Sequence, residues 1–452
     1  MVLERGSAVD LKRALPQLRR LAAELFADRQ LPQLALVRQR IEAPVLAEVE
    51  LEVQAQVREV IRRSGRSPQP VAVGGGSRGI ANLDRIVRAA VMALKDEYFE
   101  PFIVPAMGSH GASTAEGQAR VLAAYGIDEQ RMGAPVRATM DVRRIGEFDG
   151  VPVHMDRFAV EAGAVFLVAR VKPHTDFRGP IESGLAKMCA IGLGKQVGAR
   201  VMHSYGVHGL RHHLARAAGV AAETGLLLGG LGIVENARDE TALVRGFTAH
   251  EIGRPEEARL LEAARSMMPR IPFAELDVLV VEHMGKDVSG TGMDSNVLNR
   301  MRVPGEPEPD GLRIGAVAVL DLTDASHGNA IGIGLADFVT ARLMAKVDLG
   351  AVYANALTAG LVGIERAQLP IVLPSDRDAI LAAISSCGRP ADVTPRLAWI
   401  EDTLHTEVMA VSEPLLEEVR RMPEMEVISP LRPMPVDADG ELRRLRALPV
   451  PA

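Results

Sequence analysis

Cysteine and aromatic residues are scarce in this sequence. Cys189 and Cys387 are the only cysteines among 452 residues, and no CxxC pair is present. A disulfide framework and the common zinc and iron–sulfur sites all need more cysteines than this, so we expect a reducing, cytoplasmic compartment. Aromatic residues make up only 3% of the chain. The protein cores must therefore be built from aliphatic side chains and methionine.

Long apolar runs and a strong charge of one sign are also missing. No stretch reaches the about 18 apolar residues that a membrane-spanning helix needs. The first twenty residues, MVLERGSAVDLKRALPQLRR, lack the apolar block of a signal peptide. The formal net charge is −6, whereas a nucleic-acid partner favours a basic face. We therefore expect neither a membrane nor a nucleic acid as a partner.

The pattern along the chain predicts an α/β fold with two domains. Residues 10–65 carry apolar residues at helical spacing, and after them short β-rich runs alternate with loops and amphipathic helices. This alternation predicts mainly parallel sheets flanked by helices, with an active site in the interdomain cleft. We predict an N-terminal catalytic and cofactor-binding domain over 1–271 and a C-terminal domain closing over the cleft over 272–412. Residues 413–452 are expected to form a helix and then a proline-rich tail that packs on the surface.

Three strand-like runs end in loops that each carry one polar side chain. Arg78 lies in VAVGGGSRGI, His110 in PFIVPAMGSHGAST and His174 in AVFLVARVKPHTDFRG, and the last loop leads on to Lys187 and His203. Open α/β sheets bind ligands outside the carboxyl ends of their strands, so we expect these groups to converge. Such a set of groups is typical of a catalytic site.

The glycine loop GGGSRG at 74–79 has two interpretations. Its backbone N–H groups can approach an anion at a helix start, which makes Gly76 and Ser77 candidate cofactor contacts. It lacks the GK[ST] of a Walker loop and a full dinucleotide fingerprint, and a tight strand-to-helix turn explains it equally well. Arg78 has the geometry to hold a carboxylate with two hydrogen bonds, and a surface salt bridge is the alternative.

Two histidines stand where backbone constraint favours a functional role. His110 is flanked by glycines directly after an apolar strand, and His174 follows a proline that stiffens its loop. Their unperturbed pKa of about 6.5 allows each to act as acid or base at neutral pH.

The other histidines are weaker candidates. His208, His212 and His213 fall on a helix face that looks polar, and solvation explains them better than a metal cluster does. His283 and His327 follow strands and are possible contributions of the second domain to a cleft.

The order Arg78, His110, His174, Lys187, His203 carries a family resemblance. The motifs GSHG, KPHTDFRG, GLAKM and RVMHS that contain the last four resemble the nickel-pincer lactate racemase family and its α-hydroxyacid racemase relatives. The sixteen-residue step between Lys187 and His203 also matches that family.

The resemblance implies a role for each of these residues. Lys187 would carry a nickel-pincer nucleotide as a thioamide, and His203 would be a nickel ligand. His110 and His174 would alternate as acid and base on a 2-hydroxy acid, while Arg78 orients its carboxylate. A racemase needs such a nearly symmetric pair of acid/base groups, and the cofactor performs the hydrogen transfer itself. The resemblance also implies cofactor-synthesis enzymes as partners for loading, and a homodimer is possible.

Some features depart from the lactate-active members of the family. The segment GPIESG stands between His174 and Lys187, and the second-domain substrate loop corresponds best to GKDVSGTGMDSN at 285–296. In that loop we place Met293 and Asn296 at the substrate positions, with Lys286 or Asp287 as a possible substitute. These departures favour a 2-hydroxy acid larger or more polar than lactate.

Two other functions remain open at this point. The first is a 2-hydroxy acid oxidoreductase that binds a free nicotinamide cofactor at GGGSRG and has no need of Lys187. The second is a nickel-independent or non-catalytic relative that binds a small acid.

Overall fold

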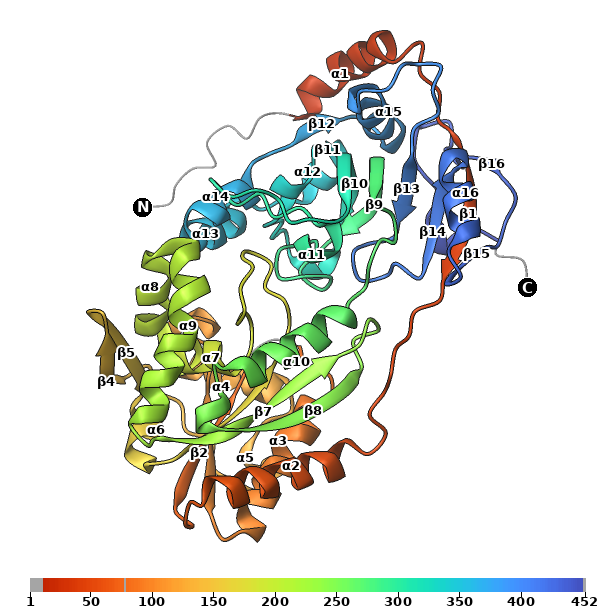
Figure 1. Ribbon diagram of the computed structural model, residues 1–452. Coiled ribbons are helices and arrows are strands. Elements are labelled where there is room, and N and C mark those ends of the chain that lie inside the picture. Colours follow the sequence, from red (N-terminus) through yellow and green to blue (C-terminus); the bar gives the residue numbers. More distant parts are fainter. Residues whose placement is uncertain (1–10, 77–78, 450–452) are drawn as a thin grey trace. The chain divides into compact units, whose positions relative to one another are not determined.

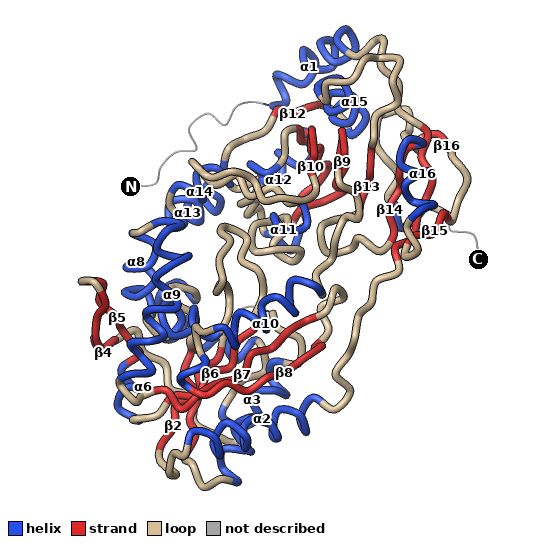
Figure 2. Tube along the Cα trace, viewed as in Figure 1, coloured by secondary structure: helices blue, strands red, loops and turns tan. Residues whose placement is uncertain are grey.

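The computed structural model of the protein describes residues 11–76 and 79–449. The chain forms two compact units, Glu42–Met268 (the central unit) and Met1–Ile41 with Pro269–Ala452 (the terminal unit). Each unit contains parallel strands flanked by helices (Figures 1 and 2), so the predicted α/β class is confirmed.

The central unit is built on a five-stranded sheet with the order β3-β2-β6-β7-β8. All neighbouring strands are parallel except β7 and β8, and β4 and β5 form a separate antiparallel pair. The strands are β2 (Pro70–Gly75), β3 (Glu100–Pro105), β4 (Val142–Phe148), β5 (Val151–Asp156), β6 (Val165–Arg170), β7 (Leu227–Glu235) and β8 (Thr241–Thr248). The helices are α2 (Val49–Ser64), α3 (Leu83–Asp96), α4 (Ala115–Ala124), α5 (Glu129–Met132), α6 (Arg157–Ala162), α7 (Leu185–Lys187), α8 (Lys195–Ser204), α9 (Gly206–Glu223) and α10 (Pro255–Ser266), with short turns η1 (Gly111–Ser113), η2 (Met188–Gly192) and η3 (Ala249–Glu251).

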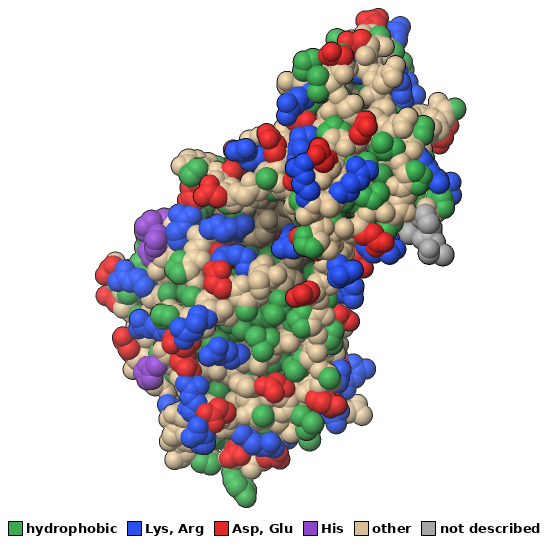
Figure 3. Space-filling model, turned by 45° about the vertical axis from the view of Figure 1, so that its right-hand side comes forward, with side chains coloured by type: hydrophobic (Ala, Val, Ile, Leu, Met, Phe, Trp, Pro, Cys, Tyr) green, Lys and Arg blue, Asp and Glu red, His purple; other side chains and the backbone are tan. Residues whose placement is uncertain are grey.

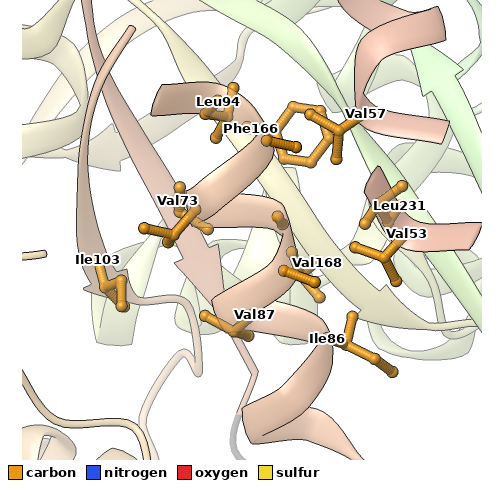
Figure 4. Close-up of a cluster of buried hydrophobic side chains, with 14 of the residues drawn as sticks. Val53, Val57, Val73, Ile86, Val87, Leu94, Ile103, Phe166, Val168 and Leu231 are labelled. Atoms are coloured by element: carbon orange, nitrogen blue, oxygen red, sulfur yellow. The ribbon is translucent and has the colours of Figure 1, made fainter. Parts of the chain in front are cut away.

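Helices cover both faces of this sheet, which explains the unbroken apolar run of β6. On one face, Val57 of α2 and Ile86 of α3 pack with Val168 of β6 (Figure 4). On the other face, Leu167 packs in the same cluster as Leu260 of α10. A parallel strand buried on both sides is apolar at every position rather than at alternate ones.

The terminal unit contains a nine-stranded sheet. The path β12-β11-β10-β9-β13-β14-β1-β15 runs across it, and β16 also pairs with β1. The strands are β1 (Gln33–Gln39), β9 (Glu275–Met284), β10 (Arg313–Leu322), β11 (Phe338–Thr340), β12 (Ile371–Leu373), β13 (Leu397–Ile400), β14 (Val408–Ser412), β15 (Met425–Val427) and β16 (Arg432–Pro433). The helices are α1 (Leu11–Leu25), α11 (Ser295–Leu298), α12 (Ala341–Lys346), α13 (Leu349–Ala359), α14 (Leu361–Ala367), α15 (Asp376–Ser386) and α16 (Glu413–Arg421), with turns η4 (Asp324–Ser326), η5 (Ile333–Leu335) and η6 (Leu445–Ala447).

The start of the chain differs from our prediction. We expected helix over residues 10–65 and one domain over 1–271, but QLALVRQ forms β1, which pairs with β14 and β15 of the terminal unit. A short apolar run such as LALV is ambiguous, because hydrophobic periodicity alone does not separate a buried strand from a helix segment.

The end of the chain also differs. Residues 413–452 do begin with a helix, but β15 and β16 then pair with β1 instead of wrapping the surface. Leu442 and Leu445 are buried in the same apolar cluster as Trp399. The C-terminal segment is thus part of the sheet and core of the terminal unit.

The described helices and the surface charges match what the composition indicated about apolar length and charge balance. None of the helices in the described part of the chain has the length and apolar character needed to cross a membrane. Acidic and basic side chains are mixed over the face that Figure 3 shows.

Candidate active site

The carboxyl ends of β3, β2 and β6 lie next to one another, and the loops that follow them approach one segment, residues 187–192. After β2, a Cβ on Gly76 would lie 3.8 Å from the Met188 methyl group. After β3, the N–H of Gly108 donates to the carbonyl of Gly192 at 3.1 Å. This is the edge of a parallel sheet where ligands bind.

The loop after β6 brings His174 against Lys187. The Nε2 atom of His174 lies 2.7 Å from the Lys187 Nζ, and 11% of the histidine side chain is exposed. The backbone N–H of Asp176 donates to Nδ1 of the same ring at 3.1 Å. A neutral imidazole with an accepting Nδ1 carries its proton on Nε2, so it donates that proton to the lysine amine. In this tautomer the imidazole is the donor of the contact and the amine nitrogen its acceptor.

Glu182 holds the backbone of the His174 loop. Its Oε2 accepts the His174 N–H at 2.6 Å, and its Oε1 accepts from the Gly179 N–H at 3.0 Å and from Arg265 Nη2 at 2.8 Å. The side chain is fully buried. Burial raises the pKa of Glu182, although the backbone N–H groups and Arg265 oppose the shift.

Glu257 of α10 holds the helical turn that ends at Lys187. Its Oε1 accepts the Ala186 N–H at 3.2 Å and its Oε2 the Gly253 N–H at 2.7 Å. The side chain is 1% exposed, and this burial raises the pKa of Glu257.

Gln118 of α4 supports the His110 loop in a similar way. Its Nε2 donates to the Gly108 carbonyl at 2.8 Å and to the His110 carbonyl at 3.3 Å. Its Oε1 accepts from Lys195 Nζ at 3.1 Å, and Lys195 forms a fully buried ion pair with Asp156 at 2.9 Å. The side chain of His110 itself is exposed.

His203 lies at the end of α8 and is half-buried. Burial lowers the pKa of His203, a charge on Lys187 would lower it further, and Asp176 opposes the shift. A neutral imidazole is the form that binds a metal. Cys189 is buried, and burial raises the pKa of its thiol.

Other predicted residues are placed as follows. Ser77 and Arg78 lie outside the described residues. In the terminal unit, Lys286 Nζ donates to the Gly290 carbonyl at 2.6 Å, and Asn296 Nδ2 donates to Asp294 Oδ1 at 2.7 Å. These two side chains therefore stabilise the loop after β9.

One of the three histidines of α9 differs from our interpretation of a solvated face, since His208 and His212 are exposed and His213 is buried. His208 and His212 are in contact, with ring centroids 4.7 Å apart. His213 is only 8% exposed, because its ring packs edge-on against Phe148 and Tyr205.

Sequence reasoning missed the residues that support these loops. Glu182 belongs to GPIESG, and a carboxylate in a glycine- and proline-containing loop between two candidate residues is a usable signal. Glu257 is one glutamate among several in a charged helix, RPEEARLLEAARS, and Gln118 is one polar residue of an ordinary helix. For these two, the sequence contains no local signal.

Removing the Glu182 carboxylate should destabilise the protein and loosen the loop of His174. Glu182→Ala leaves two partly buried backbone N–H groups without their acceptor, at about 1–3 kcal/mol each. We expect urea-induced unfolding to show a loss of about 2–4 kcal/mol. Glu161→Ala, on an exposed pair with Arg157, is the matched control and should cost less than about 1 kcal/mol. Equal losses in the two variants would show that Glu182 does not hold the loop.

The buried carboxyl of Glu257 should make stability fall as the pH rises. Its pKa in the folded state is above that of an exposed glutamate, about 4.3. The folded state therefore retains the proton longer, and this stabilising contribution is lost as the pH rises through the folded pKa. Glu257→Gln removes this titration. The free energy of unfolding of the variant, relative to that of the wild type, should therefore increase as the pH rises above about 4. Parallel pH profiles of the two proteins, measured by thermal unfolding, would contradict this.

Comparison with known proteins identified no family model and no curated protein that matches this sequence. Among solved structures, the chain is similar to a protein from Thermotoga maritima, with 14% identity, a TM-score of 0.45, and coverage of 60% of this chain and 70% of that one. It is also similar to the lactate racemase apoprotein from Thermoanaerobacterium thermosaccharolyticum, with 11% identity, a TM-score of 0.42, and coverage of 81% and 85%. Similarities this weak assign no function.

Proposed function

We propose that the protein is an isomerase, a racemase or epimerase that inverts the α-carbon of a 2-hydroxy acid with a nickel-pincer nucleotide bound to Lys187. The observation that supports this most is the 2.7 Å contact between Lys187 Nζ and His174 Nε2. It joins a predicted acid/base group to the predicted attachment point, where an amine would react as a nucleophile in its unprotonated form.

The groups around Lys187 suit such a cofactor. An amine with a lone pair can form the thioamide bond, and His203 offers a half-buried imidazole with a lowered pKa as a ligand for nickel. Gly76, without a side chain, leaves its backbone open to close approach beside Met188.

When bound, the cofactor would accept the α-hydrogen of the substrate with its electron pair and return it to the same carbon. His174 would take the hydroxyl proton of one enantiomer and His110 that of the other, and each would return a proton as the hydroxyl re-forms. A Lys187 nitrogen bonded to the cofactor would be a poor hydrogen-bond acceptor, which would leave the His174 imidazole available to the substrate. Arg78 would hold the carboxylate.

The test is a panel of enantiopure 2-hydroxy acids, including malate and an aldonate, assayed by polarimetry. The protein is produced together with the cofactor-synthesis enzymes. We expect loss of optical rotation with at least one acid, and an α-deuterium label should remain in the product because the hydrogen does not exchange with water. Turnover that requires added NAD, or binding of an acid without any inversion, would overturn the proposal.

The carboxylate contact makes a separate prediction. Arg78→Lys should lower kcat/KM by at least about tenfold, because a point charge does not replace a planar fork with two hydrogen bonds. Arg88→Lys, on α3 of the same unit, is the control. An unchanged kcat/KM for the Arg78 variant would remove Arg78 from the site.

A further inference from the structure

The sheet of the terminal unit contains a reversal of strand order beside β9. The chain passes from β9 to β10, β11 and β12 on one side, and then returns to β13 on the other side of β9. Strands β10, β9 and β13 are parallel neighbours, so their carboxyl ends meet at one edge. In open α/β sheets, such a reversal creates the crevice in which ligands bind.

Three potential metal ligands stand at this reversal. His283 is the next-to-last residue of β9, and Glu401 and Asp402 directly follow β13. One ligand atom from each lies within 4.8 Å of the others. His283 Nε2 is 3.1 Å from Asp402 Oδ2, and two ligands bound tetrahedrally to Zn²⁺ at about 2.0–2.1 Å would stand about 3.3 Å apart.

The surroundings fit an ion with open coordination positions. His283 and Glu401 line a cavity of about 300 Å³, and the neighbouring Asp402 is 1% exposed. His405 Nδ1 lies 2.8 Å from Asp402 Oδ2 and so orients this carboxylate. Ligands held by such outer partners are typical of metal sites.

Acidic and basic side chains are mixed around the cavity. Arg446 contacts Oε2 of Glu401. The other basic groups of the lining are engaged mainly with a different carboxylate, since Arg444 and Lys346 lie 3.1 and 3.0 Å from the oxygens of Asp321. The lining also includes Glu282 and Asp324.

We propose that His283, Glu401 and Asp402 bind a divalent transition-metal ion such as Zn²⁺, with its remaining positions open to water or to an oxygen ligand in the cavity. One imidazole and two carboxylates suit Zn²⁺ or Mn²⁺. Three protein ligands with an open position are typical of catalytic rather than structural zinc sites. This site uses residues of the terminal unit alone and does not depend on the proposed racemase function.

The test uses full-length protein produced without the cofactor-synthesis enzymes and stripped with a chelator. We expect calorimetric titration with ZnCl₂, and metal analysis after desalting, to give about one tightly bound Zn²⁺ per chain. His283→Asn and Glu401→Gln should each weaken binding by at least about 100-fold. His327→Asn is the matched control, because His327 is an exposed histidine after β10 and should leave affinity unchanged.

Two results would overturn the site. One is a wild-type protein that binds no Zn²⁺, which would leave the cluster as a hydrogen-bonded network of two histidines around Asp402. The other is undiminished affinity in Glu401→Gln, which would place the metal elsewhere. Because Glu401→Gln preserves shape, it keeps the test decisive if the histidine variant does not fold.

Discussion

Lys187→Ala is expected to abolish attachment of the cofactor and, with it, all racemisation. The variant lacks the only atom proposed to bond the nucleotide covalently. Intact-mass spectrometry and nickel analysis of protein produced with the cofactor-synthesis enzymes measure this directly. Wild-type protein should carry the added mass and nickel, and the variant should carry neither.

The control for this experiment is Lys95→Ala. Lys95 is an exposed lysine of the same unit, at the end of α3, and its replacement should leave the adduct intact. If the adduct forms normally on Lys187→Ala, the attachment point is another residue and the proposed chemistry of the site fails.

His110→Ala and His174→Ala are expected to load the cofactor and yet lose turnover by about 10²–10⁴-fold. Inversion in either direction needs one imidazole to take the hydroxyl proton and the other to give one back, so each single variant should block both directions. The loss should appear in kcat, with nickel content close to that of the wild type. His250→Ala, an exposed histidine on η3, is the matched control.

Different results for the two variants would assign different roles to His110 and His174. If His174→Ala fails to load, the main role of His174 is to position the Lys187 amine rather than to exchange protons with the substrate. If His110→Ala keeps full activity in both directions, a two-base mechanism is wrong. His110 would then be an exposed loop histidine without a role in the reaction.

The sequence was enough to predict how the central sheet presents its loops. Apolar runs such as VFLVAR reach an abrupt end at glycine- or proline-containing loops, and polar side chains appear there. The carboxyl ends of parallel strands share one edge of a sheet. Local patterns were therefore sufficient to predict that the loops of Gly76, Gly108 and His174 lie near the segment that begins at Lys187.

Only the tertiary structure revealed what supports those loops. Glu182, Glu257 and Gln118 act through hydrogen bonds to backbone groups, and Glu257 comes from a helix that is distant in sequence from the turn it holds. Hydrogen bonding of this kind leaves no periodic pattern, because a single buried carboxylate resembles any other glutamate of an amphipathic helix.

By itself, the sequence determined the α/β class, the buried parallel strands and the polar residues at their ends, because these follow from side-chain patterns over a few consecutive residues. The tertiary structure decided that β1 joins the sheet of the terminal unit and that His283 meets Glu401 and Asp402. Both depend on contacts between segments that are more than one hundred residues apart in the sequence. Such pairing is set by packing of the whole chain, which no local pattern encodes.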